Sequence, residues 1–329
     1  MTKSLELRRR DVMALTAGLT AGLVLPRVAW GQEKLQILVA YYGALVNAGI
    51  VAVGQEKGFY NTPAIDVRNV VSTIGGGTAI RNMIGGGVEY GIVGTSAALT
   101  AIKSGIDIKI VHGVIRTMQD LLWVSMPNSG INSIQDLKGK KIGFTKPQSI
   151  SETMAKWMVE KHGLTGQVEL VSLGSVAAGL SALEAGGVAA ALINEPLWSA
   201  RQDRYKIAFT LEEVPPASQM VGVATSSMIQ KKPEVVRDLV DAYAKSAAFI
   251  YEDPAEAGRL MAKRYGETVL KPEVAVAAVT RMAKIDFWSR GEIDLKGLDV
   301  WLSFMRQQGE IDGDFDWNTA ISTSYQPKG

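Results

Sequence analysis

Few side chains in this sequence have the chemistry of a nucleophile or a metal ligand. The chain of 329 residues contains no cysteine, which excludes disulfide bonds, thiolate nucleophiles and cysteine-based metal sites. Its two histidines, His112 and His162, are far apart in the sequence and lack the spacing of a zinc site. We therefore predict no catalytic residue, no metal and no cofactor, and expect a function in binding.

Two glycine triplets, residues 75–77 and 85–87, form the most distinctive motif. The stretch lacks the Gly-Lys-Ser/Thr ending of a nucleotide phosphate loop and the full dinucleotide fingerprint. The first triplet precedes a predicted helix, 78–84, where glycine lets a ligand approach the free N–H groups of the first turn. The second triplet ends that helix, where a positive φ is needed. The alternative is that all of these glycines only form turns.

Short apolar runs alternate with helical segments along most of the chain. The first set of predicted strands covers residues 35–41, 65–71, 88–93 and 106–114. The second set covers residues 121–126, 140–144, 168–173, 188–193 and 205–211, followed by a return strand at 219–228. This alternation predicts an α/β fold with parallel strands. The remainder is predicted to be helical, with Pro233, Pro254 and Pro272 in first turns and Asp253 as a cap.

Residues 74–95 and 174–195 share a layout of loop, short helix, glycine turn, buried strand and polar loop. Val88 then falls on Val188, and Gly86 falls on Gly186. Few residues are identical, so the similarity lies in the order of the elements. It predicts two similar α/β lobes in one chain.

The turns that follow the strands supply the candidate ligand contacts. Ligands of open parallel sheets bind outside the carboxyl ends of the strands, where helix N-termini present free N–H donors. The candidates from the first set of strands are Tyr42, Gly43, Gly76, Thr78, Thr95 and Ser96. The candidates from the second set are Gln148, Ser149, Ser151, Ser175 and Glu195. Two facing rims of this kind would form a cleft.

Several of these side chains have a second interpretation. Ser149 to Glu152 fit a capping box, so Ser149 is either a helix cap or a ligand contact. Glu195 either contacts a ligand amine or braces the end of its strand. Tyr41 and Tyr42 alternate across a strand end, and we favour Tyr42 as the one that faces the cleft.

The first 31 residues have the layout of an export signal. A basic cluster, Arg8–Arg10, precedes an uncharged run from Val12 to Pro26 that is shorter than the roughly 20 residues of a membrane span. Ala29-Trp30-Gly31 then predicts cleavage before Gln32. Arg9-Arg10 resembles a twin-arginine signal, with the general secretory route as the alternative. We expect a periplasmic protein, and without cysteine it is not a lipoprotein.

The charge of the remaining chain is close to neutral. The net charge is +2, and the first 31 residues contain five basic and two acidic side chains. This balance gives no reason to expect nucleic acid as a partner.

Four segments together resemble a known family. They are "VGQEKGFY" (53–60), "GGGTAIRNMIGGGVEYGIVGTSAALTAIKSG" (75–105), "SGINSIQDLKGKKIGF" (129–144) and "LEAGGVAAALINEP" (183–196). They resemble the substrate-binding proteins of ABC importers of the nitrate/sulfonate/taurine type, which include binders of thiamine-precursor pyrimidines. The resemblance covers nearly the whole chain after the export signal, from Leu35 to at least Tyr265. One departure is "GFYNTPAID", which shortens a common loop.

The resemblance implies a two-lobed periplasmic-binding-protein fold of type II with C-terminal helices. It places crossing strands near residues 116–121 and 217–222. Lobe 1 then comprises residues 34–118 and 222–329, and lobe 2 comprises residues 119–221. Arg116, at the first crossing, either pairs with an anionic ligand or stays a solvated surface arginine.

The resemblance also implies a function. The protein would be the extracytoplasmic solute-binding component of an ABC importer, a monomer that closes on a small anionic or polar organic ligand by hinge motion. The ligand classes are sulfonate, nitrate, carboxylate and pyrimidine, and the partners are a membrane permease and its ATPase. One alternative is a decarboxylase- or desulfinase-like enzyme, although enzymes of this fold rely on cysteines. The other is a ligand-sensing partner of a membrane receptor.

Overall fold

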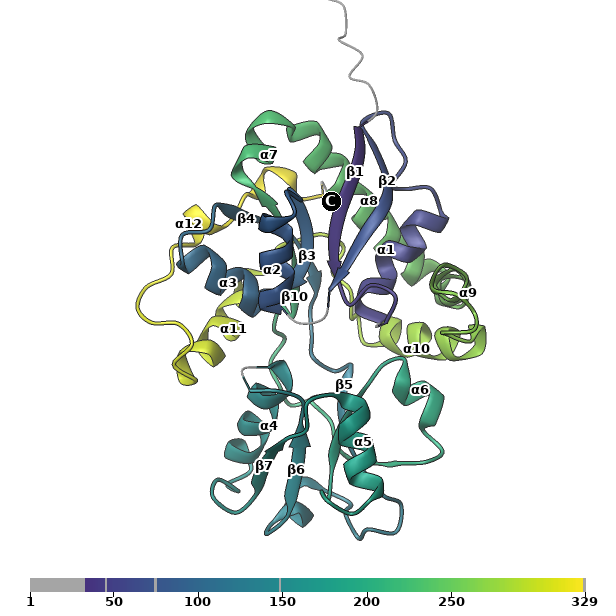
Figure 1. Cartoon of the computed structure of the whole chain (residues 1–329), viewed down its shortest axis with the longest axis vertical. Coiled ribbons are helices and arrows are strands. Elements are labelled where there is room, and N and C mark those ends of the chain that lie inside the picture. Colours follow the sequence, from purple (N-terminus) through teal and green to yellow (C-terminus); the bar gives the residue numbers. More distant parts are fainter. Residues whose placement is uncertain (1–32, 45, 74–75, 148, 328–329) are drawn as a thin grey trace, which may run out of the picture. The chain divides into compact units, whose positions relative to one another are not determined.

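A computed structural model describes residues 33–44, 46–73, 76–147 and 149–327. The predicted export signal (1–31) and Gln148 lie outside the described residues. The predicted α/β class is confirmed, since strands and helices alternate along the chain (Figure 1). The largest sheet has the order β2 (Ile65–Thr73), β1 (Glu33–Ala40), β3 (Tyr90–Gly94), β10 (Met220–Thr225), β4 (Ile108–Ile115).

The helices beside this sheet form two groups. Helices α2 (Gly76–Gly85) and α3 (Thr95–Lys103) pack against its strands, and α11 (Leu295–Gln307) packs on α3. Helix α1 (Val46–Glu56) packs against α8 (Pro233–Glu252) and α9 (Pro254–Tyr265), and α9 packs against α10 (Pro272–Lys284) (Figure 1). The three predicted helix starts at proline are confirmed. The predicted cap is confirmed as well, since Asp253 accepts a hydrogen bond from Glu256 N at 2.9 Å.

The middle of the chain forms two smaller sheets. Strand β5 (Leu121–Ser125) lies between β8 (Ala191–Asn194) and β9 (Lys206–Phe209). Strand β6 (Lys141–Phe144) pairs with β7 (Glu169–Ser172). The connecting segments include η1 (Ile134–Leu137), α4 (Ile150–Lys161), α5 (Val176–Glu184) and α6 (Leu197–Arg201).

The sheets are less parallel than the sequence predicts. Strand β1 is parallel to β2 and β3, and β6 is parallel to β7. However, β10 is antiparallel to β3 and β4, and β5 is antiparallel to β8 and β9. Both β5 and β10 directly follow a connection between sheets, so each enters its sheet from the opposite end. The predicted return strand 219–228 is also shorter, because Thr225 Oγ1 caps Met228 N at 3.2 Å and starts α7 (Ser226–Lys231).

The predicted repeat corresponds to two equivalent runs of elements. Helix α2, a glycine turn and β3 are followed by α3, and helix α5, a glycine turn and β8 are followed by α6. Gly87 and Gly186 lie in the turns directly after the two helices and have φ values of 66° and 75°, a conformation that glycine adopts readily. The lobe boundaries given above stay a prediction.

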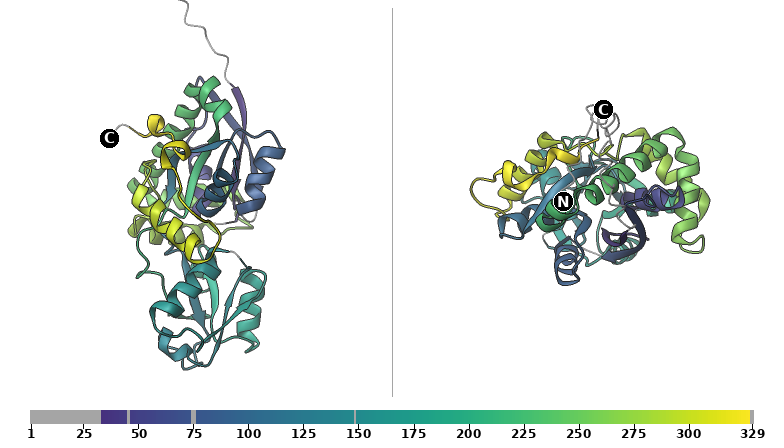
Figure 2. Two further views of the ribbon diagram at one scale, coloured as in Figure 1. Left: turned by 90° about the vertical axis from the view of Figure 1, so that its left-hand side faces the viewer. Right: turned by 90° about the horizontal axis from the view of Figure 1, so that it is seen from above.

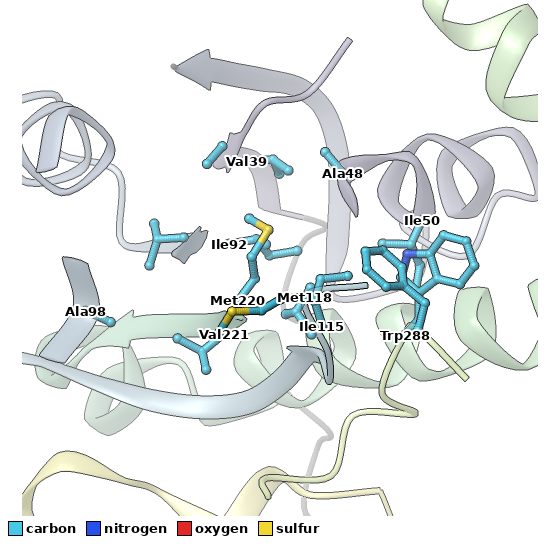
Figure 3. Close-up of a cluster of buried hydrophobic side chains, with 14 of the residues drawn as sticks. Val39, Ala48, Ile50, Ile92, Ala98, Ile115, Met118, Met220, Val221 and Trp288 are labelled. Carbon is cyan, nitrogen blue, oxygen red and sulfur yellow. The ribbon is translucent and has the colours of Figure 1, made fainter. Parts of the chain in front are cut away.

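Two connections join the five-stranded sheet to the sheet of β5, β8 and β9, and their ends adjoin a buried apolar cluster. Residues 116–120 join β4 to β5, and residues 210–219 join β9 to β10. Met220 pairs with Ile115 across the β10–β4 ladder, and Met118 and Trp288 belong to the same buried cluster (Figure 3). The C-terminal segment, α12 (Trp317–Ala320) and η2 (Thr323–Tyr325), returns to this sheet, where Ser322 N donates to Ile110 O (Figure 2).

His112, on strand β4, is fully buried and is held as a neutral ring. Its Nδ1 lies 2.8 Å from Gly113 O, which can only accept, so Nδ1 carries the proton. Its Nε2 therefore accepts the hydrogen bond of Tyr90 OH at 2.6 Å. The ring also contacts Tyr243, with centroids 4.6 Å apart. Desolvation lowers the pKa of His112 from 6.5 to about 4, partly offset by the bond to Gly113.

This burial makes the contribution of His112 to stability depend on pH. A folded-state pKa below the unfolded value means that the contribution is complete above pH 6.5 and declines as the pH falls toward 4. We expect the free energy of unfolding of the wild type, relative to His112→Gln, to fall by roughly 2 kcal/mol between pH 7 and pH 5. Urea titrations of both proteins at both pH values measure this difference, in which other titrating groups cancel. A constant difference would contradict the assigned neutral ring.

Candidate functional site

Three buried polar side chains join helix α1 to both connections between the sheets. Asn47 is in the first turn of α1, Asp120 precedes β5, and Gln219 precedes β10. Asn47 Nδ2 donates to Asp120 Oδ2 at 3.3 Å and to Gln219 Oε1 at 3.0 Å, and Gln219 Nε2 donates to Asp120 Oδ1 at 2.8 Å. We call these three residues the crossing network.

Burial dominates the electrostatics of the crossing network. Desolvation raises the pKa of Asp120 from 3.8 to about 7, while the hydrogen bond from Gln219 opposes the shift. Glu195 raises this pKa further and Arg281 lowers it, so both charges act on the same carboxyl group. The carboxyl group of Asp120 therefore changes its protonation state close to neutral pH.

A buried ion pair lies beside the crossing network. Glu195 follows β8 and is 0% exposed, and its Oε1 accepts from Arg281 Nη1 of α10 at 3.0 Å. Its Oε2 accepts from Ser199 N at 3.1 Å. Of the two roles predicted for Glu195, the structure shows the bracing contact, and ligand contact stays a prediction.

Three hydroxyl groups gather at the start of α4. Ser151 Oγ lies 2.8 Å from Thr145 Oγ1 and 2.9 Å from Ser149 Oγ, and Thr145 Oγ1 lies 3.2 Å from Ser149 Oγ. Ser149 also accepts from Glu152 N at 3.3 Å, which confirms the predicted helix cap. The structure thus brings Ser149 and Ser151 together and adds Thr145.

Thr95 connects the start of α3 to the crossing network. Its side chain is fully buried, and its N–H donates to Gln219 O at 3.0 Å. Ser96 follows it and is half-buried. Gly76 is the first residue of α2, and the exposed Thr78 accepts from Arg81 at 3.2 Å. Gly43 lies in the turn between β1 and α1 with a φ of 82°.

Three other candidates make contacts away from the crossing network. Tyr42 OH donates to Gln55 Oε1 at 2.6 Å and accepts from Arg264 Nε at 3.2 Å. Arg116 pairs with Asp286 and lies 3.9 Å from Glu292 Oε1. Ser175 is exposed and caps α5 through Ala178 N at 3.1 Å. Each side chain has a structural role, and ligand contact by them stays a prediction.

Two surface hollows lie outside this region. One is lined by residues of the amino ends of β1 and β3, together with Met228. The other is lined by Gln36, Tyr42, Arg68, Asn69, Val70 and Arg264. Neither lining includes a member of the crossing network. Across the described ranges, no group of three or more histidine, aspartate or glutamate residues is placed to hold a metal ion. In the same ranges, no helix is long and apolar enough to cross a membrane.

Sequence reasoning missed Asn47, Asp120, Gln219, Thr145 and Arg281. A signal existed for two of them, since Asp120 and Gln219 are polar residues directly before the apolar runs "LLWVS" and "MVGVA". Because each run begins a strand after a connection between sheets, a polar residue in that place lies where the connections meet. Nothing in the sequence marks Arg281 as the partner of Glu195.

Comparisons with known proteins agree on the fold. The family model described as "NMT1/THI5 like" matches residues 46–257. A search of curated protein sequences finds no match. The periplasmic aliphatic sulphonate binding protein SsuA from Escherichia coli is similar, with a TM-score of 0.71, 17% identity, and coverage of 91% of this chain and 95% of that one.

Two further solved structures show the range of activities found on this fold. The alkanesulfonate-binding protein SsuA from Xanthomonas axonopodis pv. citri, bound to MOPS, has a TM-score of 0.69 and 17% identity over 89% of this chain and 99% of that one. The desulfurization enzyme DSZB has a TM-score of 0.66 and 14% identity over 89% and 97%. The periplasmic-binding-protein fold expected from the sequence is therefore confirmed.

Proposed function

This chain belongs to the NMT1/THI5-like family, and on that premise we propose that it is the extracytoplasmic solute-binding component of an ABC importer. Several of the similar structures are named as binding proteins or binding components, and three of them are named for sulfonates. The observation that carries the proposal is the crossing network, which places buried polar groups at a helix N-terminus where both connections between the sheets pass.

The proposed ligand is a small polar organic molecule or anion bound between lobe 1 and lobe 2. Thr95 and Ser96 face it from lobe 1, and Ser149 and Ser151 face it from lobe 2. The connections near residues 116–121 and 217–222 act as the hinge, because they join the two lobes and carry Asp120 and Gln219. Closure of the lobes buries the ligand and presents a shape that the permease recognises. The protein is exported as a monomer, and its partners are a permease and an ATPase.

Closure on a ligand has two observable consequences. A ligand that binds only the folded state raises the melting temperature, and closure lowers the radius of gyration. We expect at least one member of a panel of sulfonates, nitrate, carboxylates and pyrimidines to raise the melting temperature by several degrees and to contract the protein in small-angle X-ray scattering. If no member of a broad library produces either change, the solute-binding proposal is wrong.

A second candidate is an enzyme on the same scaffold, which the similarity to the desulfurization enzyme DSZB favours. The binding proposal ranks first because this chain has no cysteine to serve as a nucleophile. Release of sulfite from an aromatic sulfinate by the purified protein would reverse that ranking. A sensor role differs only in the membrane partner, and neighbouring genes for a permease and an ATPase would favour transport.

A further inference from the structure

The hydrogen bonds of the crossing network fix the orientation of the Asn47 amide. The ionised carboxylate of Asp120 only accepts, so the nitrogen of Gln219 must face Oδ1, and Gln219 Oε1 is then left as an acceptor. Asn47 lies against Asp120 Oδ2 and Gln219 Oε1, both acceptors, so its nitrogen must face them. Its oxygen, Oδ1, therefore points away from the network as an acceptor.

Two buried polar groups next to the network lack a partner within the described part of the chain: the amide oxygen of Asn47, which only accepts, and the hydroxyl of Thr95, which can donate or accept. Among the described residues, no hydrogen-bond partner lies near Asn47 Oδ1 or Thr95 Oγ1, although both atoms are buried. Buried polar atoms are nearly always satisfied, so an exception calls for a functional explanation. The two residues are linked through Gln219, which accepts from Thr95 N with its backbone oxygen and from Asn47 with its side chain. They thus form one patch at the N-termini of α1 and α3.

The charges around this patch disfavour an anion. Asp120 and Glu195 are both fully buried there, and Arg281 is the positive side chain that acts on both. Arg281 already donates to Glu195 at 3.0 Å. Arg116, for which pairing with an anionic ligand is one of two predicted roles, pairs with Asp286. A negatively charged headgroup at Asn47 would lie next to the Asp120 carboxylate, while the nearby Arg281 is already paired with Glu195.

We infer that the ligand carries a hydrogen-bond-donating headgroup, such as an amine, a primary amide or an amino-substituted heterocycle, that donates to Asn47 Oδ1. This inference rests on the proposed function, because it assigns the chemical class of the solute that the protein would bind. Sulfonate, nitrate and carboxylate groups are acceptors only and cannot form this bond. A group with an N–H forms it and also places partial positive charge toward Asp120 and Glu195.

Matched ligand pairs test the inference directly. Each pair keeps one skeleton and exchanges the headgroup: an alkanesulfonate with its primary sulfonamide, benzoate with benzamide, and pyrimidine with 4-aminopyrimidine. Calorimetric titration is done at pH 8, where Asp120 is ionised. In every pair that binds, we expect the member with the N–H group to have a dissociation constant about tenfold or more below that of its partner. One satisfied buried hydrogen bond usually contributes about this much to the binding free energy.

Two variants locate the preference. Asn47→Leu removes the acceptor, so the donor preference should disappear if circular dichroism shows the variant folded. Thr95→Val removes a buried hydroxyl without a protein partner, so it should keep or raise the melting temperature while weakening the donor ligand about tenfold. Thr100→Val, the same change at an exposed position of α3, is the matched control and should leave affinity unchanged.

The outcomes separate this inference from the proposed function. Equal binding within the pairs, or tighter binding of the acceptor-only members, overturns the donor headgroup while solute binding stands. If Thr95→Val leaves the affinity for the donor ligand unchanged, the ligand does not bind at the patch formed by Asn47 and Thr95. Binding by no member of any pair, or of the wider panel, contradicts solute binding itself, and the inference fails with it.

Discussion

Gly222→Ala is expected to destabilise the protein by about 3 kcal/mol or more, and we expect little folded protein at 37 °C. A Cβ at this position would lie 1.9 Å from His112 Nε2 and 2.3 Å from the neighbouring ring carbon. The ring cannot move aside, because Tyr90 and Gly113 hold both of its nitrogens. The backbone cannot shift either, because β10 is paired on both sides, with β3 and β4.

Gly85→Ala is the matched control for this substitution. Gly85 ends α2, and a Cβ there would meet no atom within 4 Å. Alanine also favours the helix, so the control should be neutral or up to about 1 kcal/mol more stable than the wild type. Urea denaturation of the three proteins measures both effects. A Gly222→Ala variant as stable as Gly85→Ala would show that the packing around His112 is incorrect.

Arg281→Met is expected to destabilise the protein by about 3 kcal/mol. Methionine keeps most of the side-chain volume but leaves the Glu195 carboxylate buried without its ion pair, and removing one partner of a buried pair typically costs about 3–5 kcal/mol. The low end of that range applies because the Arg281 side chain is 33% exposed, whereas that of Glu195 is 0% exposed.

A double-mutant cycle identifies the source of this effect. Adding Glu195→Gln replaces the buried, unpaired carboxylate with a neutral amide. The double variant should therefore recover at least half of the stability lost in Arg281→Met. Lys284→Met, near the exposed end of the same helix, is the control and should change stability by less than about 0.5 kcal/mol. A double variant no more stable than Arg281→Met would mean that the lost contacts, and not the buried charge, set the cost.

Local patterns predicted many of the elements correctly. The apolar run 88–93 and the predicted helix 78–84 correspond to β3 (Tyr90–Gly94) and α2 (Gly76–Gly85). These segments follow from side-chain periodicity and from glycine at their ends, which are properties of neighbouring residues. The predicted parallel direction of β5 was wrong. A short apolar run such as "LLWVS" has the same pattern in a parallel and an antiparallel ladder, so the sequence alone does not distinguish the two.

The candidate site was predictable only in part. Ser149 and Ser151 lie in one helix turn, so a local pattern was enough to group them. Asn47, Asp120 and Gln219 are separated by 73, 99 and 172 positions, and only the folded chain brings them together. The same holds for Arg116, whose partner Asp286 is 170 positions away. Spacing in one sequence carries no information on such pairs.

A crystal structure of the protein with the tightest-binding ligand tests the central claim most directly. We predict a single ligand held between the two lobes, with a donor atom within about 3.2 Å of Asn47 Oδ1 and a polar atom near Thr95 Oγ1. A ligand bound instead in the hollow lined by Gln36, Arg68 and Arg264, or between lobes but remote from α1, would contradict it.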